Sequence, residues 1–300
     1  MKILVTGSNG FIGRKIVVKM LSKGYQVIGL DKSKSNLMHH PNFDNLTFNL
    51  NSENMNNIRK YDFNYVIHAA AQTSVTSSVL NPKQDVQSNI FGTLELISAI
   101  SEKDIKGLIY LNSGGAIYDQ NQPLPFTETS LCAPSSPYGI SKLAAEYYLQ
   151  SYAQISGISF TSLRLSNVYT DEKISRVNNN VIEIWFDQIL KRNKIVVNGA
   201  ETMRDFVHVD DVVSAIDNSI SGLPGIYNIG SGSPITLKSL ASKITSLINF
   251  DVEIEWSDLP KGEVMQSYLD ITKAKQSLGW EPETDLTSAL GRYWDNLKDA

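Results

Sequence analysis

Tyr138 and Lys142 are the two residues of this chain whose types and spacing best suit proton transfer. They are four positions apart, so on a helix they share one face. Free tyrosine has a pKa of about 10 and is a poor base at neutral pH, but a neighbouring ammonium favours the tyrosinate. A tyrosinate can take the proton of a substrate hydroxyl. The same pattern also occurs on plain surface helices, so its chemical meaning depends on its surroundings.

A glycine-rich turn near the N-terminus supplies those surroundings. The residues Gly7-Ser8-Asn9-Gly10-Phe11-Ile12-Gly13 follow the apolar run 2–6 and precede an amphipathic stretch that stops at Gly24. Glycines let the backbone turn tightly and approach a ligand closely. A helix that starts here directs free N–H groups and its positive end at phosphates. The context therefore predicts a dinucleotide site.

Asp31 indicates which dinucleotide is bound. It ends the apolar segment 25–31, about twenty residues past the glycines, where an acid would accept from the adenosine ribose hydroxyls. A carboxylate would repel a 2′-phosphate, which favours NAD, although Lys32 and Lys34 soften that preference. With NAD bound, Tyr138 would take a hydroxyl proton while the substrate carbon gives up hydride. The alternative is an ordinary strand–helix turn with a solvated Asp31.

Composition limits the other classes of partner. The formal net charge of −4 argues against nucleic acid or anionic membranes as main partners. Cys132 is the single cysteine and fits a reducing compartment, and no apolar run approaches the roughly 20 residues that span a bilayer. We therefore expect a cytoplasmic protein. His68 and His208 lie in apolar segments without metal-ligand spacing, so no metal site is expected.

The first two-thirds of the chain alternates strand-like and helix-like segments. The strand candidates are residues 2–6, 25–31, 46–50, 65–69, 107–112 and 159–165, and the longest helix candidates are 82–102 and 138–156. Short strands rich in Val, Ile and Leu are typical of sheets covered on both faces. The pattern predicts an α/β fold with a doubly wound parallel Rossmann sheet.

The pattern changes beyond Asn167. Residues 171–180 and 257–264 are polar and predict loops, whereas 181–191, 236–248 and 286–297 predict helices. We expect residues 1–170, with a return segment near 204–232, to form an NAD-binding domain. Residues 171–203 and 233–300 would form a smaller C-terminal α/β substrate-binding lobe.

The chain resembles the NAD-dependent nucleotide-sugar epimerase/dehydratase family of extended short-chain dehydrogenases/reductases, and is UDP-glucose 4-epimerase-like. The resemblance covers nearly the whole length. Its motifs are the glycine turn, His68-Ala69-Ala70-Ala71, Asn89 with Gly92-Thr93, residues 113–118, Tyr138-Gly139-Ile140-Ser141-Lys142, residues 164–169, residues 204–211 and Leu278-Gly279-Trp280.

The resemblance implies further cofactor contacts. Phe11 and Ile12 would offer backbone amides to the pyrophosphate, and Asn49 would accept from the adenine amino group where relatives carry Asp. Asn89 would support Lys142 through a water. Three small residues would line the cofactor cleft: Ala69, Ala70 and Ala71. The alternatives are close helix–sheet packing for the alanines and a surface position for Asn89.

Substrate contacts are also implied. Asn167 and Arg204 would bind the substrate diphosphate, since a guanidinium fork matches phosphate oxygens. Arg204 and Asp205 forming a local ion pair is the alternative. Where relatives carry a second diphosphate-binding Arg, this chain has Pro260 followed by Lys261, whose ammonium can substitute as a point charge.

The segment after strand 107–112 departs from the family pattern. Gly114, expected to contact substrate, stands where relatives place a Ser or Thr that hydrogen-bonds the reacting oxygen. Either Ser113 takes this role, which we favour, or water and Tyr138 act without it. Gly115 and Ala116 replace the acid pair of sugar 4,6-dehydratases, which argues against dehydration.

Together these features predict an NAD-dependent epimerase of a nucleotide-activated sugar, most simply at C4 through a 4-keto intermediate. A reductase or dehydrogenase of a nucleotide-linked 4-keto-6-deoxy sugar is the alternative, and it must exchange its nicotinamide. A non-catalytic dinucleotide-binding protein would not need both Tyr138 and Lys142. Relatives pair through the helices that correspond to 82–102 and 138–156, so a homodimer with Tyr147, Tyr148 and Tyr152 near its contact is expected.

Overall fold

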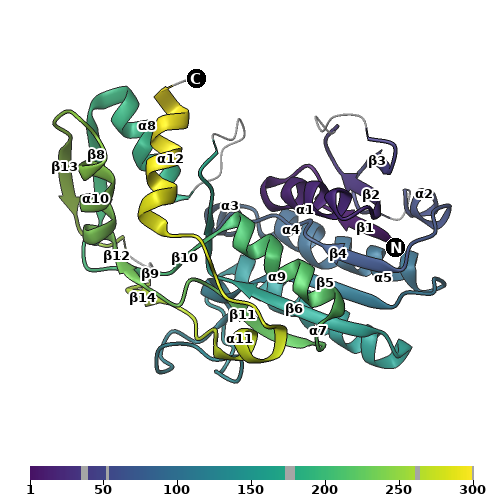
Figure 1. Cartoon of the computed structure of the whole chain (residues 1–300). Helices are drawn as coiled ribbons and strands as arrows, with labels where there is room; N and C mark the ends of the chain where they lie inside the picture. Colours follow the sequence, from purple (N-terminus) through teal and green to yellow (C-terminus); the bar gives the residue numbers. More distant parts are fainter. Residues whose placement is uncertain (35–39, 52–53, 173–179, 261–263, 299–300) are drawn as a thin grey trace.

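The computed structural model describes residues 1–34, 40–51, 54–172, 180–260 and 264–298 (Figure 1). Seven parallel strands form its main sheet. Their order across the sheet is β11 (Gly225–Ile229), β6 (Ser159–Leu165), β5 (Gly107–Ser113), β4 (Tyr65–His68), β1 (Lys2–Thr6), β2 (Gln26–Asp31) and β3 (Phe43–Thr47). The chain winds one way from β1 to β3 and the other way from β4 onward, so a crevice for ligands is expected beyond the carboxyl ends of β1 and β4. The predicted fold class is confirmed.

Helices cover both faces of this sheet. One face packs against α1 (Phe11–Ser22), α9 (Val209–Ser221) and α11 (Thr272–Leu278), and the other against α2 (Met55–Arg59), α5 (Gly92–Ile100) and α7 (Pro137–Ser156). Along β1, Ile3 and Val5 enter the first core while Leu4 enters the second. Alternate residues of a strand face opposite sides, so both faces demand apolar residues.

A smaller C-terminal lobe stands beside the sheet, at the upper left of Figure 1. Its core joins α8 (Val181–Arg192), α10 (Leu237–Ser246) and α12 (Leu286–Lys298) to the parallel pair β8 (Lys194–Asn198) and β13 (Glu253–Ser257). Two further small sheets complete this side: β12 (Ile235–Thr236), β9 (Met203–Arg204) and β14 (Gln266–Ser267) form one, and β7 (Asn167–Tyr169) with β10 (Phe206–His208) the other. The domain boundaries given above stay a prediction.

The predicted strand 46–50 is wrong. The third strand is β3, which pairs with β2 in a register running from Val27 opposite Phe43 to Asp31 opposite Thr47. Leu46, Phe48 and Leu50 still pack on the core beneath α5, which accounts for their apolar alternation beyond the end of the strand. Pairing with β2, and not hydrophobicity alone, sets the limits of the strand.

The predicted helix 82–102 is three consecutive pieces. It begins as α4 (Pro82–Val86), continues through the π-helical turn η1 (Gln87–Phe91) and ends as α5 at Ile100. Asn81 caps it by accepting from the backbone N–H of Gln84 at 3.2 Å. Single π turns mark functional sites in many helices, and this one carries Asn89. The short helices α3 (Val75–Leu80) and α6 (Gly114–Ile117) flank the same region. No helix in the described ranges is long and apolar enough to cross a membrane.

Candidate active site

The glycine turn lies against the chain that leaves β4. Gly7 has a φ of +70°, and a Cβ there would stand 2.7 Å from the Ala70 backbone nitrogen. A Cβ on Gly13 would stand only 1.9 Å from the Gly7 carbonyl oxygen. Neither position can hold a side chain without moving backbone, so the first turn of α1 packs directly beside residues 69–71 at the crevice. Ala69, Ala70 and Ala71 are half-buried there.

The N-terminus of α1 suits a phosphate group. Gly10 is its N-cap residue, and no side chain in the described structure caps the helix. Arg14 is the first residue whose N–H bonds back to the Gly10 carbonyl, at 3.1 Å. The amides of Phe11, Ile12 and Gly13 precede it, and such orphan N–H groups bind anions. This cradle and its small neighbours fit the pyrophosphate of NAD.

Asp31 faces the same turn. Its Oδ2 accepts from the Asn9 N–H at 3.0 Å, and its Oδ1 accepts from the N–H and the hydroxyl of Ser33 at 2.9 and 2.8 Å. A carboxylate has about four lone-pair sites, so it keeps acceptor capacity for ribose hydroxyls. Asn49 lies exposed beyond the end of β3, and its adenine role stays a prediction.

Helix α7 begins and ends on strong local signals. The Ser136 hydroxyl accepts from the Gly139 N–H at 3.1 Å, Pro137 fills the first helical position, and Gly157 ends the helix with a φ of +67°. Tyr138 therefore sits in the first turn and Lys142 one turn later, and both side chains are buried.

Tyr138 lies at the carboxyl end of β5. Burial raises the pKa of its hydroxyl to about 12, a side-chain hydrogen bond with Ser113 lowers it, and the charge of Asp85 raises it. Ser113 is the last residue of β5 and is thus the hydroxyl beside the tyrosine. A Cβ on Gly114 would stand 2.6 Å from the Leu269 Cδ1. Leu269 thus fills the space that a side chain at 114 would need, and the role of Ser113 in place of a hydroxyl at 114 stays a prediction.

Among the residues that the structure describes, no carboxylate contacts Lys142. Its Nζ donates to the Leu111 carbonyl oxygen at 2.7 Å and lies 4.2 Å from the ring centroid of Tyr110. Burial lowers the pKa of Lys142 to about 7, while the charges of Glu146 and Asp85 raise it. Neighbouring negative charge thus partly offsets the effect of burial on the Lys142 pKa.

A buried ion pair that the sequence analysis missed lies one turn further along α7. Glu146 Oε1 is 2.6 Å from Arg164 Nη2, and Asn112 donates to Glu146 Oε2 at 2.7 Å. Arg164 also donates to the Tyr118 hydroxyl at 2.9 Å. Burial raises the pKa of Glu146, but the hydrogen bonds and charge of Arg164 hold it below its ordinary value. The position of Glu146, four residues after Lys142, was the available signal.

Asn89 is buried and not a surface group. Its Nδ2 donates to the Ser141 hydroxyl at 2.9 Å, and its Oδ1 accepts from the Gln72 N–H at 2.8 Å. The structure thus places Asn89 between the cofactor-side loop and α7. Its predicted link to Lys142 through a water stays a prediction.

His68 is a neutral, buried side chain that lies between the hydroxyls of Thr6 and Thr93. Burial, with the charge of Lys142, lowers its pKa to about 3. Its Nδ1 lies 2.7 Å from the Thr6 hydroxyl and its Nε2 lies 3.0 Å from the Thr93 hydroxyl. Thr93 gives its proton to the Asn89 carbonyl at 2.6 Å, so His68 must donate through Nε2.

The predicted substrate residues lie on the side of the C-terminal lobe. Asn167 is exposed at the start of β7, and its Nδ2 donates to the Asp205 carbonyl at 3.0 Å. Arg204 is half-buried in β9 and donates to the Met203 carbonyl at 3.0 Å. The Asp205 carboxylate is buried and accepts from the Ser231 N–H at 2.8 Å. Lys261 lies outside the described residues.

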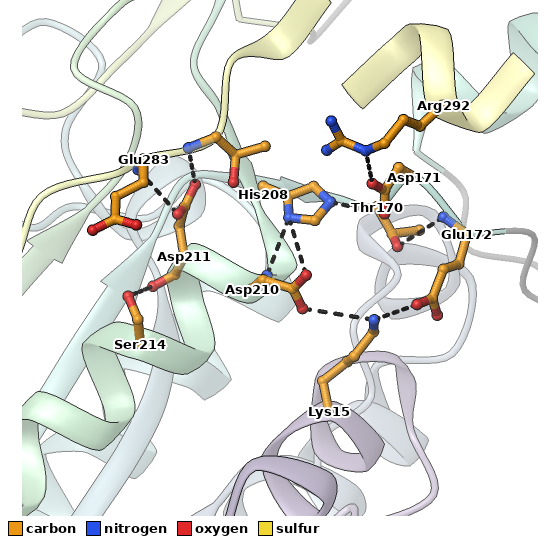
Figure 2. Close-up of polar contacts among 11 residues, drawn as sticks. Lys15, Thr170, Asp171, Glu172, His208, Asp210, Asp211, Ser214, Glu283 and Arg292 are labelled. Carbon is orange, nitrogen blue, oxygen red and sulfur yellow. Dashed lines mark hydrogen bonds and ion pairs between the residues drawn. The ribbon is translucent and has the colours of Figure 1, made fainter. Parts of the chain in front are cut away.

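A second charged cluster joins the sheet to the lobe (Figure 2), and we name it the interlobe clasp. Its members are Lys15, Asp171, Glu172, His208, Asp210 and Arg292. Asp171 Oδ2 is 2.6 Å from Arg292 Nε of α12, and Asp171 Oδ1 is 3.2 Å from His208 Nε2. Lys15 of α1 contacts Glu172 at 2.6 Å and Asp210 at 3.6 Å. The clasp thus ties α1, α9 and α12 together.

The doubly wound sheet and the glycine turn define a dinucleotide-binding enzyme class, and comparison with known proteins narrows it. The chain belongs to the NAD dependent epimerase/dehydratase family, whose model matches residues 3–230. The family is NAD-dependent, so NAD is the cofactor.

Curated and solved relatives cover nearly the whole chain. A putative UDP-glucose 4-epimerase of Methanocaldococcus jannaschii is 36% identical over 99% of this chain and 98% of its own length. A dTDP-4-dehydro-6-deoxyglucose reductase of Escherichia coli is 27% identical over 99% and 97%. Among solved structures, UDP-glucose 4-epimerase of Thermotoga maritima with UDP-glucose matches with a TM-score of 0.92 and 34% identity, covering 100% of this chain and 99% of that one.

Proposed function

We propose that the protein is an NAD-dependent epimerase of a nucleotide-activated sugar, acting at C4 through a 4-keto intermediate. One observation carries this proposal: Ser113, Tyr138 and Lys142 come together at the carboxyl end of β5, beside the crevice that fits NAD. Relatives at 36% and 34% identity bear the name UDP-glucose 4-epimerase. The bound nicotinamide supplies a hydride acceptor that later returns the hydride.

Three residues of this chain would carry out and support the proton transfer. Tyr138 Oη takes the proton of the C4 hydroxyl as the C4–H bond breaks, and Ser113 Oγ orients the reacting oxygen. The Lys142 ammonium stabilises the tyrosinate in a buried site, where charge acts strongly. When the sugar is reduced again on the other face of C4, Tyr138 would give the proton back to the oxygen.

The substrate would lie between the sheet and the lobe. Arg204 and Asn167, and Lys261 beyond the described residues, would bind its diphosphate. The Thermotoga maritima relative holds UDP-glucose, so a UDP-sugar is the first substrate to test.

Interconversion of UDP-glucose and UDP-galactose without added cofactor, followed by NMR, tests the proposal. The purified protein should interconvert them, and Tyr138→Phe should lose at least about 10²-fold in kcat. Tyr61→Phe, at a half-buried tyrosine outside both the proposed site and the proposed dimer contact, is the control and should keep its activity. Equal activity in Tyr138→Phe would reject the mechanism.

Net reduction is the second candidate, because one full-length relative is a reductase. A panel of dTDP-linked 4-keto-6-deoxy sugars with reduced cofactor separates the two functions. Stoichiometric consumption of reduced cofactor, with no interconversion in its absence, would favour the reductase.

We also propose a homodimer through the helical face of α7 and the segment 82–100. Ile140, Tyr147, Tyr148 and Phe91 are exposed apolar or aromatic residues on it. Tyr152 is half-buried against the core under α7 and contributes less to this face than expected. A monomeric mass by light scattering at micromolar concentration would exclude the dimer.

A further inference from the structure

Asp85 is a buried carboxylate for which the proposed mechanism has no role. It lies in α4 with no exposed surface. Its Oδ1 accepts from Gln72 Nε2 at 3.0 Å and from Asn89 Nδ2 at 3.2 Å. Its Oδ2 has no hydrogen-bond partner among the described residues. Burying a carboxylate without a cation is costly, so its presence calls for a physical reason.

The charged groups around Asp85 give a physical reason for its burial. The titratable groups facing this region are His68 of β4, Tyr110 of β5, and Tyr138, Lys142 and Glu146 of α7. His68 is neutral, and Glu146 has its own cation in Arg164. Lys142 is bound to a carbonyl oxygen and not to a carboxylate. The charges of Glu146 and Asp85 both favour the Lys142 ammonium, and of these two carboxylates Glu146 also pairs with Arg164, whereas Asp85 contacts no cation among the described residues.

We propose that Asp85 is a positioning residue for the reaction: its buried charge holds Lys142 as an ammonium, and its Oδ1 fixes Gln72 and Asn89 beside the cofactor crevice. The catalytic half of this inference, that Asp85 supports turnover, rests on the proposed function. The electrostatic half, that the charge of Asp85 favours the Lys142 ammonium, does not.

The hydrogen bonds show how one carboxylate serves both purposes. Gln72 directly follows the three alanines that border the glycine turn, and its N–H donates to Asn89 Oδ1 at 2.8 Å. Asn89 in turn donates to the hydroxyl of Ser141, the residue before Lys142. Asp85 thus connects the cofactor-side loop, the π turn and α7. Its charge also raises the pKa of both Lys142 and Tyr138.

Asp85→Asn removes the charge with little change of shape. The amide oxygen can keep both contacts of Oδ1, and the amide nitrogen takes the place of Oδ2, which has no described partner. Glu95→Gln, the same kind of exchange at a half-buried position of α5, is the matched control. Asp85→Ser is a second, smaller charge-removing variant for use if Asp85→Asn does not fold.

The first measurement needs no activity. Lysine side chains labelled with ¹³C are titrated by NMR, and Lys142→Met assigns the Lys142 signal. In Asp85→Asn the Lys142 midpoint should fall by about half a pH unit or more, and in Glu95→Gln it should not move. An unchanged midpoint in folded Asp85→Asn or Asp85→Ser overturns the proposal.

The second measurement is the pH profile of kcat/KM. Loss of the negative charge lets both Tyr138 and Lys142 release protons more easily, so both limbs should move to lower pH in Asp85→Asn. A purely structural role would lower activity at every pH without moving the limbs, and that result overturns the catalytic half. A Lys142 midpoint that falls in Asp85→Asn, combined with a wild-type protein that has no epimerase activity, would support the effect of Asp85 on Lys142 and reject the proposed function.

Discussion

Two of the charged clusters in the described structure have similar residues and different surroundings. Around α7, Glu146 and Arg164 pair in the core, with side chains 0% and 4% exposed. In the interlobe clasp (Figure 2), Glu172 and Arg292 are 52% and 51% exposed. The buried cluster lies beneath the proposed catalytic pair, whereas the clasp joins surface segments of two lobes. The two clusters therefore differ in how far water surrounds their charged partners.

The physical basis is the local dielectric. Water and salt screen exposed pairs, whose contribution to stability is about 0–1 kcal/mol. A buried pair interacts strongly, and removing one partner leaves an uncompensated charge that costs about 3–5 kcal/mol. The following variants test this difference, from the largest expected effect to the smallest.

Glu146→Gln should have the largest effect on stability. It leaves the Arg164 guanidinium buried without its carboxylate, so the free energy of unfolding should fall by about 3–5 kcal/mol at pH 7. The pKa of Glu146 is lower in the folded state than in the unfolded chain. The gap between wild type and variant should thus be full above the ordinary glutamate pKa and shrink as the pH falls through the lowered value. Urea unfolding at several pH values measures it; a gap below about 1 kcal/mol would contradict it.

Lys142→Met should abolish most activity while keeping much of the packing. It removes the ammonium but keeps an apolar stem beside Tyr110. We expect kcat to fall by about 10²-fold or more, because the tyrosinate loses its stabilising charge. The assay is sugar interconversion at pH 7, with Lys15→Met of the clasp as control. Similar losses of kcat in Lys142→Met and Lys15→Met would contradict the expected difference between the buried cluster and the clasp.

Ser113→Ala should have an intermediate effect. Its hydroxyl is the hydrogen-bond partner of Tyr138, and we expect turnover to fall at least about tenfold, equivalent to about 1.4 kcal/mol. Ser141→Ala removes the hydroxyl that accepts from Asn89 instead. Its turnover is compared with that of Ser113→Ala. Near-normal turnover in Ser113→Ala would move the role to another group.

Arg292→Ala should have the smallest effect. Burial raises the pKa of Asp171, but the hydrogen bond from Arg292 and the charge of His208 hold it below its ordinary value. Because Arg292 is half exposed, its loss should cost less than about 1 kcal/mol of unfolding free energy, and added salt should reduce the difference further. Thermal unfolding at low and high salt measures both; a loss of several kcal/mol would show that the clasp behaves as a buried cluster.

Local signals in the chain predict the elements that carry the site. The glycine turn, the start of α7 at Ser136-Pro137 and its end at Gly157 depend on neighbouring residues only. The apolar strands predict a sheet covered on both sides, and the structure has one. The end of β3 could not be predicted in this way, because pairing with β2 sets it. The π turn at Asn89 was not predicted.

The amino-acid sequence by itself determined the fold class, the dinucleotide turn and the spacing of Tyr138 and Lys142, since each follows from short-range backbone geometry and periodicity. Only the tertiary structure decided that Leu269 occupies the space beside Gly114, that Glu146 pairs with Arg164, and that Asp85 is buried with no cation in contact among the described residues. These contacts join residues far apart in the chain, and their strength depends on how completely folding removes water around them.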